Sequence, residues 1–551
     1  MNNNITDQPA IVHQYKMSGQ QPRPLTTTSM EVIRVLHVAI EYGQAVLGGL
    51  GMVTTQIVDA QNRFVSSSST QFAASIITPY YKNLYKDYLE INLVAECVHQ
   101  YNSQYIISKI YLVQQGLNKH YLVEPPEQLS KLFEINSVHE IYADMIHSSF
   151  IERIKYFNSA VAGFVNDSSE NTDILQLHDW QAALVPILLR TVYHNNLIRS
   201  VFVVHIDNAD RGRYHSDLLK GIGLQFQNGY NMLKAIGLIY ADKIVAVSPS
   251  FLRECLCTKS ENIEIEALRK IFVLAKVLDQ KTHGILNGFN FDNYCQVNKL
   301  ITDPENVYSE KLRIKYHLSR LLCGSRSEWK INPELPLILY VGRFSPEKGV
   351  DTFPQVIPAL KNKAVFIAVG RGITDEIFFL VTNHSRRTDN VFITFSEEEQ
   401  KKYIAIMRAG ADFTFVPSHR ESCGLTPMEG FANGSLCITS GIGGLIDSVI
   451  PLIHHDKDNT SGNGIFYEDM PNSQQNPSLI LALNNAITIW QELTELQKNK
   501  LQIRIINEAK RFDWLTEEGA LSQYLTVYKE TLSTLSTASS KKTLANRYSI
   551  N

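Results

Sequence analysis

The chain has 551 residues, a formal net charge of −3, and ordinary shares of hydrophobic and charged residues, 44% and 19%. A chain of this length predicts two or three domains, and its near-neutral charge gives no electrostatic reason to expect binding to nucleic acid or membrane surfaces. The seven cysteines show neither a disulfide framework nor a zinc-binding spacing, which favours a reducing compartment.

Both ends of the chain are polar. Residues 1–30 are rich in Asn, Gln and Thr and lack the apolar core of a signal peptide, and residues 533–551 are mostly Ser, Thr, Lys and Asn. We expect a disordered first tail and a flexible last one. No run approaches the ~18 apolar residues of a membrane span. A cytoplasmic protein without a transmembrane segment is therefore predicted, with a leaderless route of export left open.

The first half alternates apolar strands with helices. Residues 32–40 are apolar almost throughout, which is typical of a strand buried on both faces of a parallel sheet. Gly48-Gly49-Leu50-Gly51 and a predicted helix at 53–64 follow, the order in which doubly wound domains approach a phosphate, although a tight turn alone would also need the glycines. Further strands are predicted at 71–80, 173–181, 201–205 and 242–248, and helices at 182–192 and 230–240.

Polar residues end two of these strands. His178 is followed by Asp179 and Trp180, and His205 ends the strand at 201–205. Ligands of open α/β sheets bind at the carboxyl edge of the strands. A single histidine there is often only bonded to backbone, but two at one edge favour a functional role.

The second half restarts the pattern with a strand at 335–341. Arg343 and Lys348 lie in a glycine-flanked loop just past it; Arg grips phosphate oxygens with a fork of donors and Lys adds a point charge. Strands are also predicted at 364–369, 390–395, 413–416 and 435–439, and a last helix at about 515–532. The pair Gly443-Gly444 precedes a helix, where it allows close approach of a phosphate to the backbone.

Residues 411–429 carry the most specific pattern. The strand at 413–416 ends in a turn, Glu421 lies in the following loop, and a helix opens near Thr426, the expected N-cap, with Pro427 first in the helix. A helix N-terminus attracts phosphate, whereas Glu421 and Glu429 accept hydrogen bonds from hydroxyls. Phosphate and hydroxyls together suit a sugar nucleotide; acidic residues that merely favour the helix dipole are the alternative.

Taken together, eight segments in order between about residues 32 and 530 resemble the glycogen and starch synthases, which are retaining glycosyltransferases of the GT-B architecture. The segments are Gly48-Gly49-Leu50-Gly51, 177–180, 203–205, 240–249, 284–288, 342–349, 421–426 and 443–445. The resemblance implies an α/β fold of two Rossmann-like doubly wound domains that face each other across a cleft.

The implied division has six parts. Residues 31–292 form the acceptor-side domain, 293–332 an interdomain connection, 333–510 the nucleotide-sugar domain, and 511–532 a helix that crosses back, between the tails at 1–30 and 533–551.

The resemblance also implies the site. Arg343 and Lys348 would neutralise the donor diphosphate without a metal, Glu421 would bind the hydroxyls of the transferred sugar, and His205 would lie beside the reacting centre. His178, Asp179 and Trp180 would lie on the acceptor side. The other donor-binding candidates are Gly48, Gly49, Gly370, Gly424, Leu425, Thr426, Gly443, Gly444 and Glu429, the last resembling a glutamate that holds the ribose in the wider retaining GT-B group.

Two positions depart from the family pattern, Val46 where a lysine is usual and Ile206 where an asparagine is usual. The expected function is transfer of a hexose, glucose first, from ADP-glucose or UDP-glucose to an α-1,4-glucan, with no cofactor besides the donor. Because both departures fall on the acceptor-facing half, transfer to a protein or other non-glucan acceptor, and nucleotide-sugar binding without catalysis, remain alternatives.

Overall fold

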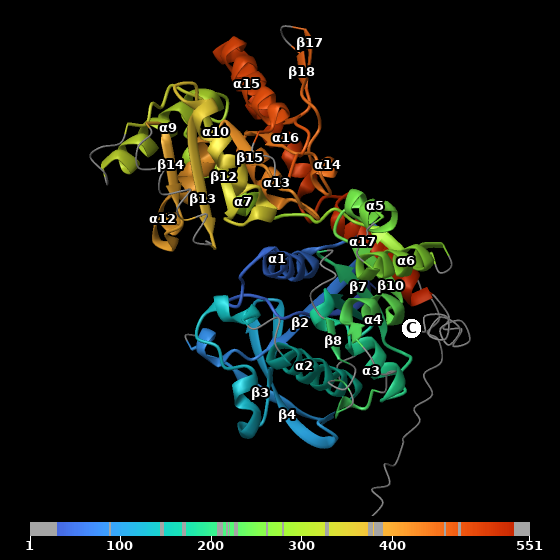
Figure 1. Cartoon of the computed structure of the whole chain (residues 1–551). Helices are drawn as coiled ribbons and strands as arrows, with labels where there is room; N and C mark the ends of the chain where they lie inside the picture. The colour runs from blue at the N-terminus through green and yellow to red at the C-terminus, as the bar shows by residue number, and fades with distance from the viewer. Residues whose placement is uncertain are drawn as a thin grey trace, which may run out of the picture.

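The computed structural model describes residues 30–533, apart from 87–89, 144–147, 168–171, 207–212, 216–218, 220, 225–229, 260–262, 278–279, 325–329, 373–377, 379–388, 457–458 and 472–474. The two predicted tails lie outside the described residues, except for Met30 and Ser533. None of the described helices is both long and apolar enough to cross a membrane. The chain folds into two lobes that lie one above the other in Figure 1.

The amino-terminal lobe is built on a nine-stranded sheet in the order β11-β10-β7-β6-β1-β2-β5-β4-β3. Neighbouring strands are parallel except where β4 meets β3 and β5. The strands are β1 (Glu31–Val38), β2 (Thr70–Pro79), β3 (Asn92–Tyr101), β4 (Gln104–Gln115), β5 (Asn118–Glu124), β6 (Ile174–His178), β7 (Arg199–Val204), β10 (Lys243–Ala246) and β11 (Thr282–Gly284). A separate pair, β8 (Arg213–His215) and β9 (Tyr230–Met232), is antiparallel.

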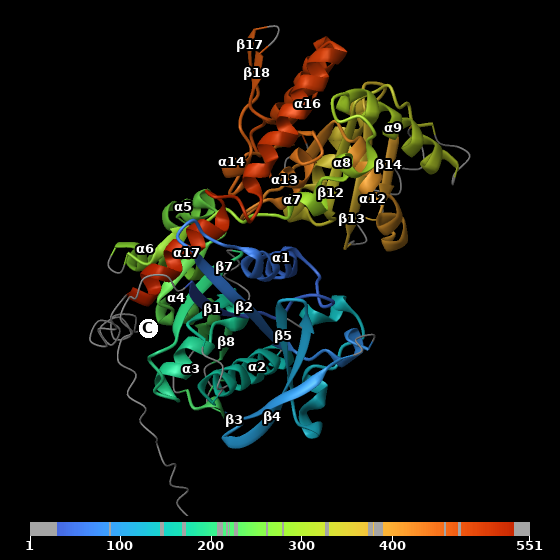
Figure 2. The ribbon, with the colours of Figure 1, turned by 180° about the vertical axis from the view of Figure 1, so that it is seen from behind.

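Helices connect these strands and pack against the sheet (Figure 2). They are α1 (Gly49–Arg63), α2 (Ser148–Asp167), α3 (Val185–Thr191), α4 (Leu233–Tyr240), α5 (Pro249–Cys257) and α6 (Ile263–Val277). The short α7 (Phe291–Tyr294) follows the last strand of this sheet and lies with the carboxy-terminal lobe in Figures 1 and 2. The central strands β1, β6 and β7 are buried almost throughout, which explains their near-continuous apolar sequences.

The carboxy-terminal lobe holds a six-stranded parallel sheet in the order β14-β13-β12-β15-β16-β19. Its strands are β12 (Leu337–Arg343), β13 (Val365–Arg371), β14 (Val391–Thr394), β15 (Phe413–Val416), β16 (Leu436–Thr439) and β19 (Gly464–Phe466), and β17 (Ile453–Asp456) pairs with β18 (Asn459–Ser461). Its helices are α8 (Gln296–Leu300), α9 (Val307–Gly324), α10 (Phe353–Leu360), α12 (Glu397–Gly410), α13 (Leu425–Phe431), α14 (Leu445–Ser448), α15 (Pro477–Glu492) and α16 (Glu495–Ala509). Two parallel-sheet lobes confirm the predicted α/β class.

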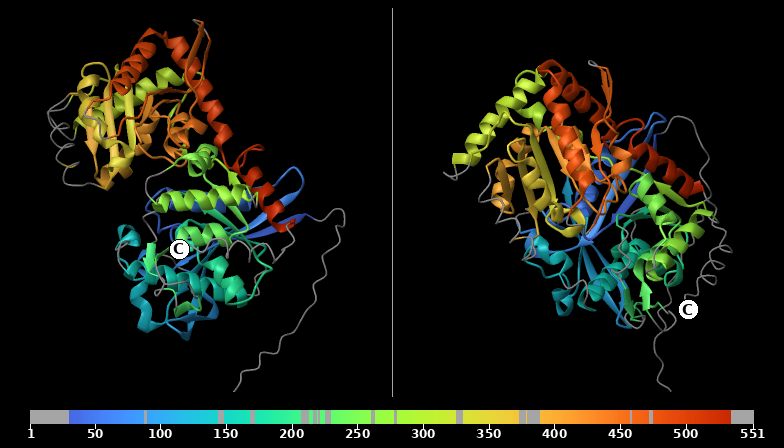
Figure 3. Two further views of the ribbon diagram at one scale, coloured as in Figure 1. Left: turned by 45° about the vertical axis from the view of Figure 1, so that its right-hand side comes forward. Right: turned by 45° about the horizontal axis from the view of Figure 1, so that its top comes forward.

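Helix α1 lies beneath β12 and β13 in both opposite views (Figures 1 and 2), and α5 lies between the lobes (Figure 3) and contacts α14 of the carboxy-terminal lobe. Within residues 293–332, expected to be a connection, α9 packs against α12 and α16 of the carboxy-terminal lobe.

The last helix, α17 (Ala520–Ser533), returns to the amino-terminal lobe. Its Glu530 accepts a hydrogen bond of 2.8 Å from Lys243, and the Tyr528 ring meets Phe72 edge to face at 5.6 Å between centroids. The last helix of the chain therefore forms part of the core of the amino-terminal lobe.

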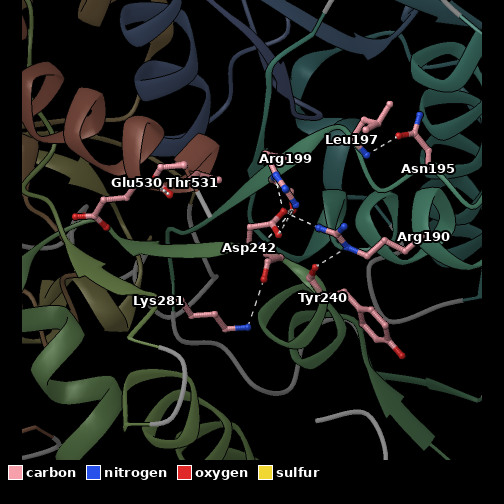
Figure 4. A network of polar contacts seen from close by, with 12 residues as sticks. Arg190, Asn195, Leu197, Arg199, Tyr240, Asp242, Lys281, Glu530 and Thr531 are labelled. Carbon is pink, nitrogen blue, oxygen red and sulfur yellow. Dashed lines mark hydrogen bonds and ion pairs between the residues drawn. The ribbon is translucent and has the colours of Figure 1, made fainter. Parts of the chain in front are cut away.

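A polar network fixes the amino-terminal ends of β7 and β10 beside α17 (Figure 4). The Asp242 carboxylate lies 2.6 Å from Arg190 of α3 and 3.9 Å from Arg199 of β7. Because all three side chains are largely buried, each charge needs its partner, and the network holds a helix and two strands in register. It lies at the edge of the sheet opposite to the ends that carry His178 and His205.

Three local predictions were wrong. The first helix begins at Gly49 rather than residue 53, because its opening turn is formed by the glycines themselves. The predicted helix at 230–240 begins only at Leu233, since residues 230–232 pair with β8. Arg343 is the last residue of β12 and does not lie beyond it.

Candidate active site

The loop after β12 presents two cations. Arg343 ends the strand with its side chain 54% exposed, and its guanidinium pairs with Glu347 one turn later. Lys348 ends the short 3-10 turn Pro346–Lys348, and the left-handed Gly349 that follows has φ +74°. A side chain at Gly349 would place its Cβ 1.8 Å from the carbonyl oxygen of Pro417, so glycine lets this loop lie against the end of β15.

Lys348 and Glu421 are in direct contact. The Lys348 ammonium donates a hydrogen bond of 2.7 Å to Glu421 Oε2, and the Ser418 hydroxyl donates to the same oxygen at 3.1 Å. Both charged side chains are about one-fifth exposed, 22% for Lys348 and 17% for Glu421. The predicted phosphate-binding cation and the predicted sugar-binding carboxylate thus share one site, and Arg343 ends the strand that leads into the Lys348 turn.

The glycine pair at 443–444 packs against the backbone of Glu421. Gly444 N donates to the Glu421 carbonyl oxygen at 2.9 Å, and a Cβ at Gly443 would lie 1.8 Å from that oxygen. Gly370 has a similar structural use, since a Cβ there would lie 2.5 Å from the Gly342 carbonyl oxygen of the neighbouring strand. Close backbone packing alone therefore explains why glycine stands at these positions.

Helix α13 begins two residues earlier than its capping pattern predicts. Gly424, with φ +83°, is the N-cap, Leu425 is the first helical residue, and Thr426 and Pro427 follow inside the helix, so the prediction that Thr426 caps the helix was wrong. The positive φ that closes the loop after Glu421 favours glycine over threonine.

Glu429 faces a different partner from Glu421. It is 9% exposed, and Arg408 of α12 contacts its carboxylate at 2.5 Å. The structure thus pairs Glu429 with Arg408 and leaves Glu421 with Lys348.

In the amino-terminal lobe, Glu41 organises the glycine-rich turn. Its Oε2 accepts hydrogen bonds from the backbone N–H groups of Leu47, at 2.6 Å, and Gly48, at 2.9 Å, while Tyr142 donates to Oε1. The Gly48 N–H is therefore already used. Helix α1 opens at Gly49, and its N-cap residue Gly48 makes no side-chain capping hydrogen bond.

The strand ends of β6 and β7 bring His178, Asp179 and His205 together. His178 Nδ1 and His205 Nε2 are 2.9 Å apart. Asp179 has a positive φ of +60°, caps the next turn through Trp180 N, and lies 3.8 Å from the ammonium of Lys234. Burial lowers the pKa of His205 to about 4 and that of His178 well below its ordinary value, so both rings are neutral at physiological pH.

Trp180 does not lie on an accessible surface. It is fully buried, and its ring packs against Phe150 at 5.7 Å between centroids. The prediction that Trp180 lies on the acceptor side was therefore wrong. Trp180 packs in the core, and a short sequence motif does not show which of its residues will be buried.

Helix α5 of the amino-terminal lobe reaches both loops of the other lobe. Ser248 donates to the Ser422 carbonyl oxygen at 2.7 Å, and Gly443 N donates to Glu254 at 2.8 Å. Ser250 bonds Asp447 through both its backbone N–H and its hydroxyl. The loop that carries Glu421 is therefore anchored from both lobes.

Sequence reasoning missed Glu41, Lys234 and Glu254. Each is a charged residue next to a motif: Glu41 precedes the glycine-rich turn, Lys234 opens the helix before residues 240–249, and Glu254 follows that segment. The position of these charged residues beside the motifs was the available signal. Lys234 donates to the backbone carbonyl of Ile206, so this contact does not depend on which side chain stands at 206.

His419, two residues before Glu421, gives the loop a pH dependence. Its ring nitrogens lie 3.0 Å from Asp351 and 2.7 Å from Asp469, and the hydrogen bond to Asp351, followed by the field of both carboxylates, raises its pKa to about 8. The charged His419 ring therefore stabilises the folded protein. This contribution is fully present below the unfolded pKa of about 6.5 and is lost as pH rises through about 8.

We therefore expect His419→Gln to destabilise the protein by about 1 kcal/mol at pH 6, after allowance for solvent screening, and to have little effect at pH 9.5. Thermal unfolding of both proteins across this range is the measurement. A constant difference between them at every pH would contradict a charged His419.

Both lobes match known families of proteins. Residues 34–270 match the model of the starch synthase catalytic domain, and residues 325–506 match that of the group 1 glycosyl transferases. The glycogen synthase of Lactococcus lactis is 27% identical over 88% of this chain and 96% of its own length, and that of Petrotoga mobilis is 23% identical over 82% and 90%.

Solved structures show the same fold. The catalytic domain of starch synthase IV from Arabidopsis thaliana, bound to ADP and acarbose, has a TM-score of 0.74 at 21% identity and covers 91% of this chain and 100% of that one. Sucrose-phosphate synthase from Thermosynechococcus elongatus gives 0.53 at 16% identity, covering 90% and 98%.

Two parallel-sheet lobes, with the starch synthase domain matched in the first and the group 1 glycosyl transferase domain matched in the second, identify a glycosyltransferase of the GT-B architecture. The starch synthase domain precedes the group 1 glycosyl transferase domain, and the glycogen synthase of Lactococcus lactis aligns over 96% of its own length. As its motifs predicted, the chain is similar to the glycogen and starch synthases over most of its length.

Proposed function

We propose that the protein transfers glucose from a nucleoside diphosphate glucose, ADP-glucose or UDP-glucose, to the end of an α-1,4-glucan, with retention of configuration and without a metal, in the cytoplasm. The contact between Lys348 and Glu421 carries this proposal, because it joins a group that binds phosphate to a group that binds sugar hydroxyls. The glycogen synthases among the relatives favour a glucan over a protein acceptor.

Binding of the donor would replace the ion pairs that Lys348 and Arg343 make in the free protein. A diphosphate attracts the Lys348 ammonium and the Arg343 guanidinium, whose present partners are Glu421 and Glu347. Glu421 is then released to accept hydrogen bonds from the hydroxyls of the glucose. Both cations would stabilise the charge that builds on the phosphates as the glycosidic bond breaks.

The remaining residues act around this centre. His205 would lie beside the glucose, with His178 and Asp179 toward the acceptor, and the turn at Gly48 and Gly49 would cover the phosphates from the other lobe. Glu429, Gly424, Leu425, Thr426, Gly370, Gly443 and Gly444 would complete the donor pocket, with Glu429 on the ribose once Arg408 shares its carboxylate. Approach of the lobes would exclude water and favour transfer over hydrolysis.

A panel of nucleotide sugars tests the donor. A ligand at 100 times its dissociation constant stabilises a protein by ~2.7 kcal/mol, so the true donor should raise the melting temperature and the other sugars should not. The selected donor, labelled in its glucose, is then incubated with glycogen and, separately, with cell lysate.

Label in glycogen that persists with a chelator present is the expected result. Label in a lysate protein alone would show another acceptor. Stabilisation without any product would show a binding protein, and activity that needs a restored divalent metal would contradict the mechanism.

A further inference from the structure

Three buried histidines form a continuous chain across the centre of the amino-terminal sheet. His37 of β1, His178 of β6 and His205 after β7 come from neighbouring strands, and the gaps between their ring nitrogens are 2.9 Å from His37 Nδ1 to His178 Nε2 and 2.9 Å from His178 Nδ1 to His205 Nε2. Their exposures are 0%, 1% and 8%. Apolar side chains would fill this part of the core equally well, so a chain of three hydrogen-bonded imidazoles indicates a further role.

The chain continues from His37 to the last helix. His37 Nε2 lies 2.8 Å from Gln61 Oε1 of α1, and Gln61 Nε2 donates to the Tyr528 hydroxyl of α17 at 2.9 Å. Tyr528 in turn donates to Gln176 Oε1 of β6. Figure 2 shows α17 running beside the strands of this lobe. We call the series Tyr528, Gln61, His37, His178 and His205 the relay.

The relay fixes where each proton lies. A neutral imidazole has one N–H and one lone pair, and burial keeps the rings neutral by lowering the pKa of His37 and of His205 to about 4. Because Gln61 Oε1 only accepts, His37 must be protonated at Nε2. Its Nδ1 then accepts from His178 Nε2–H, and His178 Nδ1 accepts from His205 Nε2–H.

His205 is left with a lone pair on Nδ1, for which the described residues provide no hydrogen-bond partner. The charged groups that face the ring are Asp179 and Lys234.

We propose that Gln61, His37 and His178 are positioning residues that hold His205 as its Nε2–H tautomer, so that Nδ1 offers a lone pair to a hydroxyl of the bound sugar. This rests on the proposed function for the place of the sugar, but the tautomer is a property of the protein alone. His37, Gln61 and Tyr528 act on the reacting centre only through their neighbours.

The direct test is nitrogen NMR of the intact protein labelled with ¹⁵N-histidine, without donor. Signals of the three rings are assigned from their loss in His37→Gln, His178→Gln and His205→Gln variants. We expect each ring to be neutral at pH 7 with its proton on Nε2. A His205 protonated on Nδ1, or a mixture of tautomers, would overturn the proposal. Since no activity is measured, this result is independent of whether the protein transfers glucose.

Substitution of Gln61 adds a functional readout. Gln61→Glu keeps an acceptor toward His37, whereas Gln61→Met keeps the length of the side chain and removes the acceptor. We expect Gln61→Met to give mixed tautomers at His205 and to lower kcat by roughly 10-fold with little change in the KM for the donor, and Gln61→Glu to restore the Nε2–H tautomer.

Tyr524→Phe, which removes a buried tyrosine hydroxyl one turn earlier on α17 and outside the relay, should leave the His205 spectrum unchanged. If Gln61→Met unfolds the protein, Tyr528→Phe takes its place, since it frees the Gln61 amide to rotate. An unchanged His205 spectrum in a folded Gln61→Met or Tyr528→Phe variant would contradict the relay.

Discussion

Replacing Lys348 by alanine should lower turnover by more than ~100-fold, and Arg343→Ala should do the same. Lys348 holds Glu421 at 2.7 Å in the free protein, and both cations are the groups that would neutralise a departing diphosphate. Loss of Lys348 therefore removes transition-state stabilisation and, among the described residues, leaves the Glu421 carboxylate with the Ser418 hydroxyl as its partner. The measurement is kcat with the donor identified by thermal stabilisation.

Lys361→Ala is the matched control, because it removes one exposed lysine of the same lobe away from the site. It should keep near-normal activity and the same net charge as the test variants. Near-normal turnover in both Lys348→Ala and Arg343→Ala would refute their assignment to the diphosphate.

Gly443→Ala should abolish measurable transfer. The new Cβ would lie 1.8 Å from the carbonyl oxygen of Glu421, a distance that no side-chain rotation can relieve, because both atoms belong to the backbone framework of the site. The Glu421 loop must therefore move, and with it the contacts to Lys348 and to Ser248 of the other lobe. We expect a loss of more than ~100-fold in kcat/KM, about 3 kcal/mol in transition-state binding.

Gly372→Ala separates this clash from backbone strain. Gly443 has φ +48° and Gly372 φ +76°, so alanine costs roughly 1 kcal/mol at either position for the left-handed conformation. A Cβ at Gly372, however, meets nothing within 4 Å. Gly372→Ala should lower stability slightly and keep activity. Equal losses of activity in the two variants would show that strain alone, and not displacement of Glu421, is responsible.

Patterns local in sequence were predicted well. Apolar runs located β1, β7, β12 and β15 because strands buried on both faces must be apolar throughout. The motif residues Lys348 and Glu421 were found singly, but their direct contact joins positions 73 apart in the chain and depends on how β12 and β15 pair. No local pattern carries that information.

Where tertiary contacts overrode a local rule, prediction failed. Thr426 has a favourable capping side chain, yet Gly424 is the cap because the loop after Glu421 needs a positive φ. The turn at Gly48 reads as an open phosphate cradle, but the Glu41 carboxylate already accepts its N–H. The hydrogen bond between Tyr528 and Gln61 joins distant parts of the chain, and only the fold shows it.

The return of α17 has a consequence for how the protein is made. Ribosomes deliver the chain from its first residue, so the nine strands of the first lobe have all emerged by residue 284, while Tyr528 follows 244 residues later. At about 5–20 residues per second, that interval is on the order of 10–50 s. The core of the amino-terminal lobe therefore stays partly exposed until the last helix has been synthesised. During that interval the carboxy-terminal lobe folds beside an incomplete amino-terminal lobe.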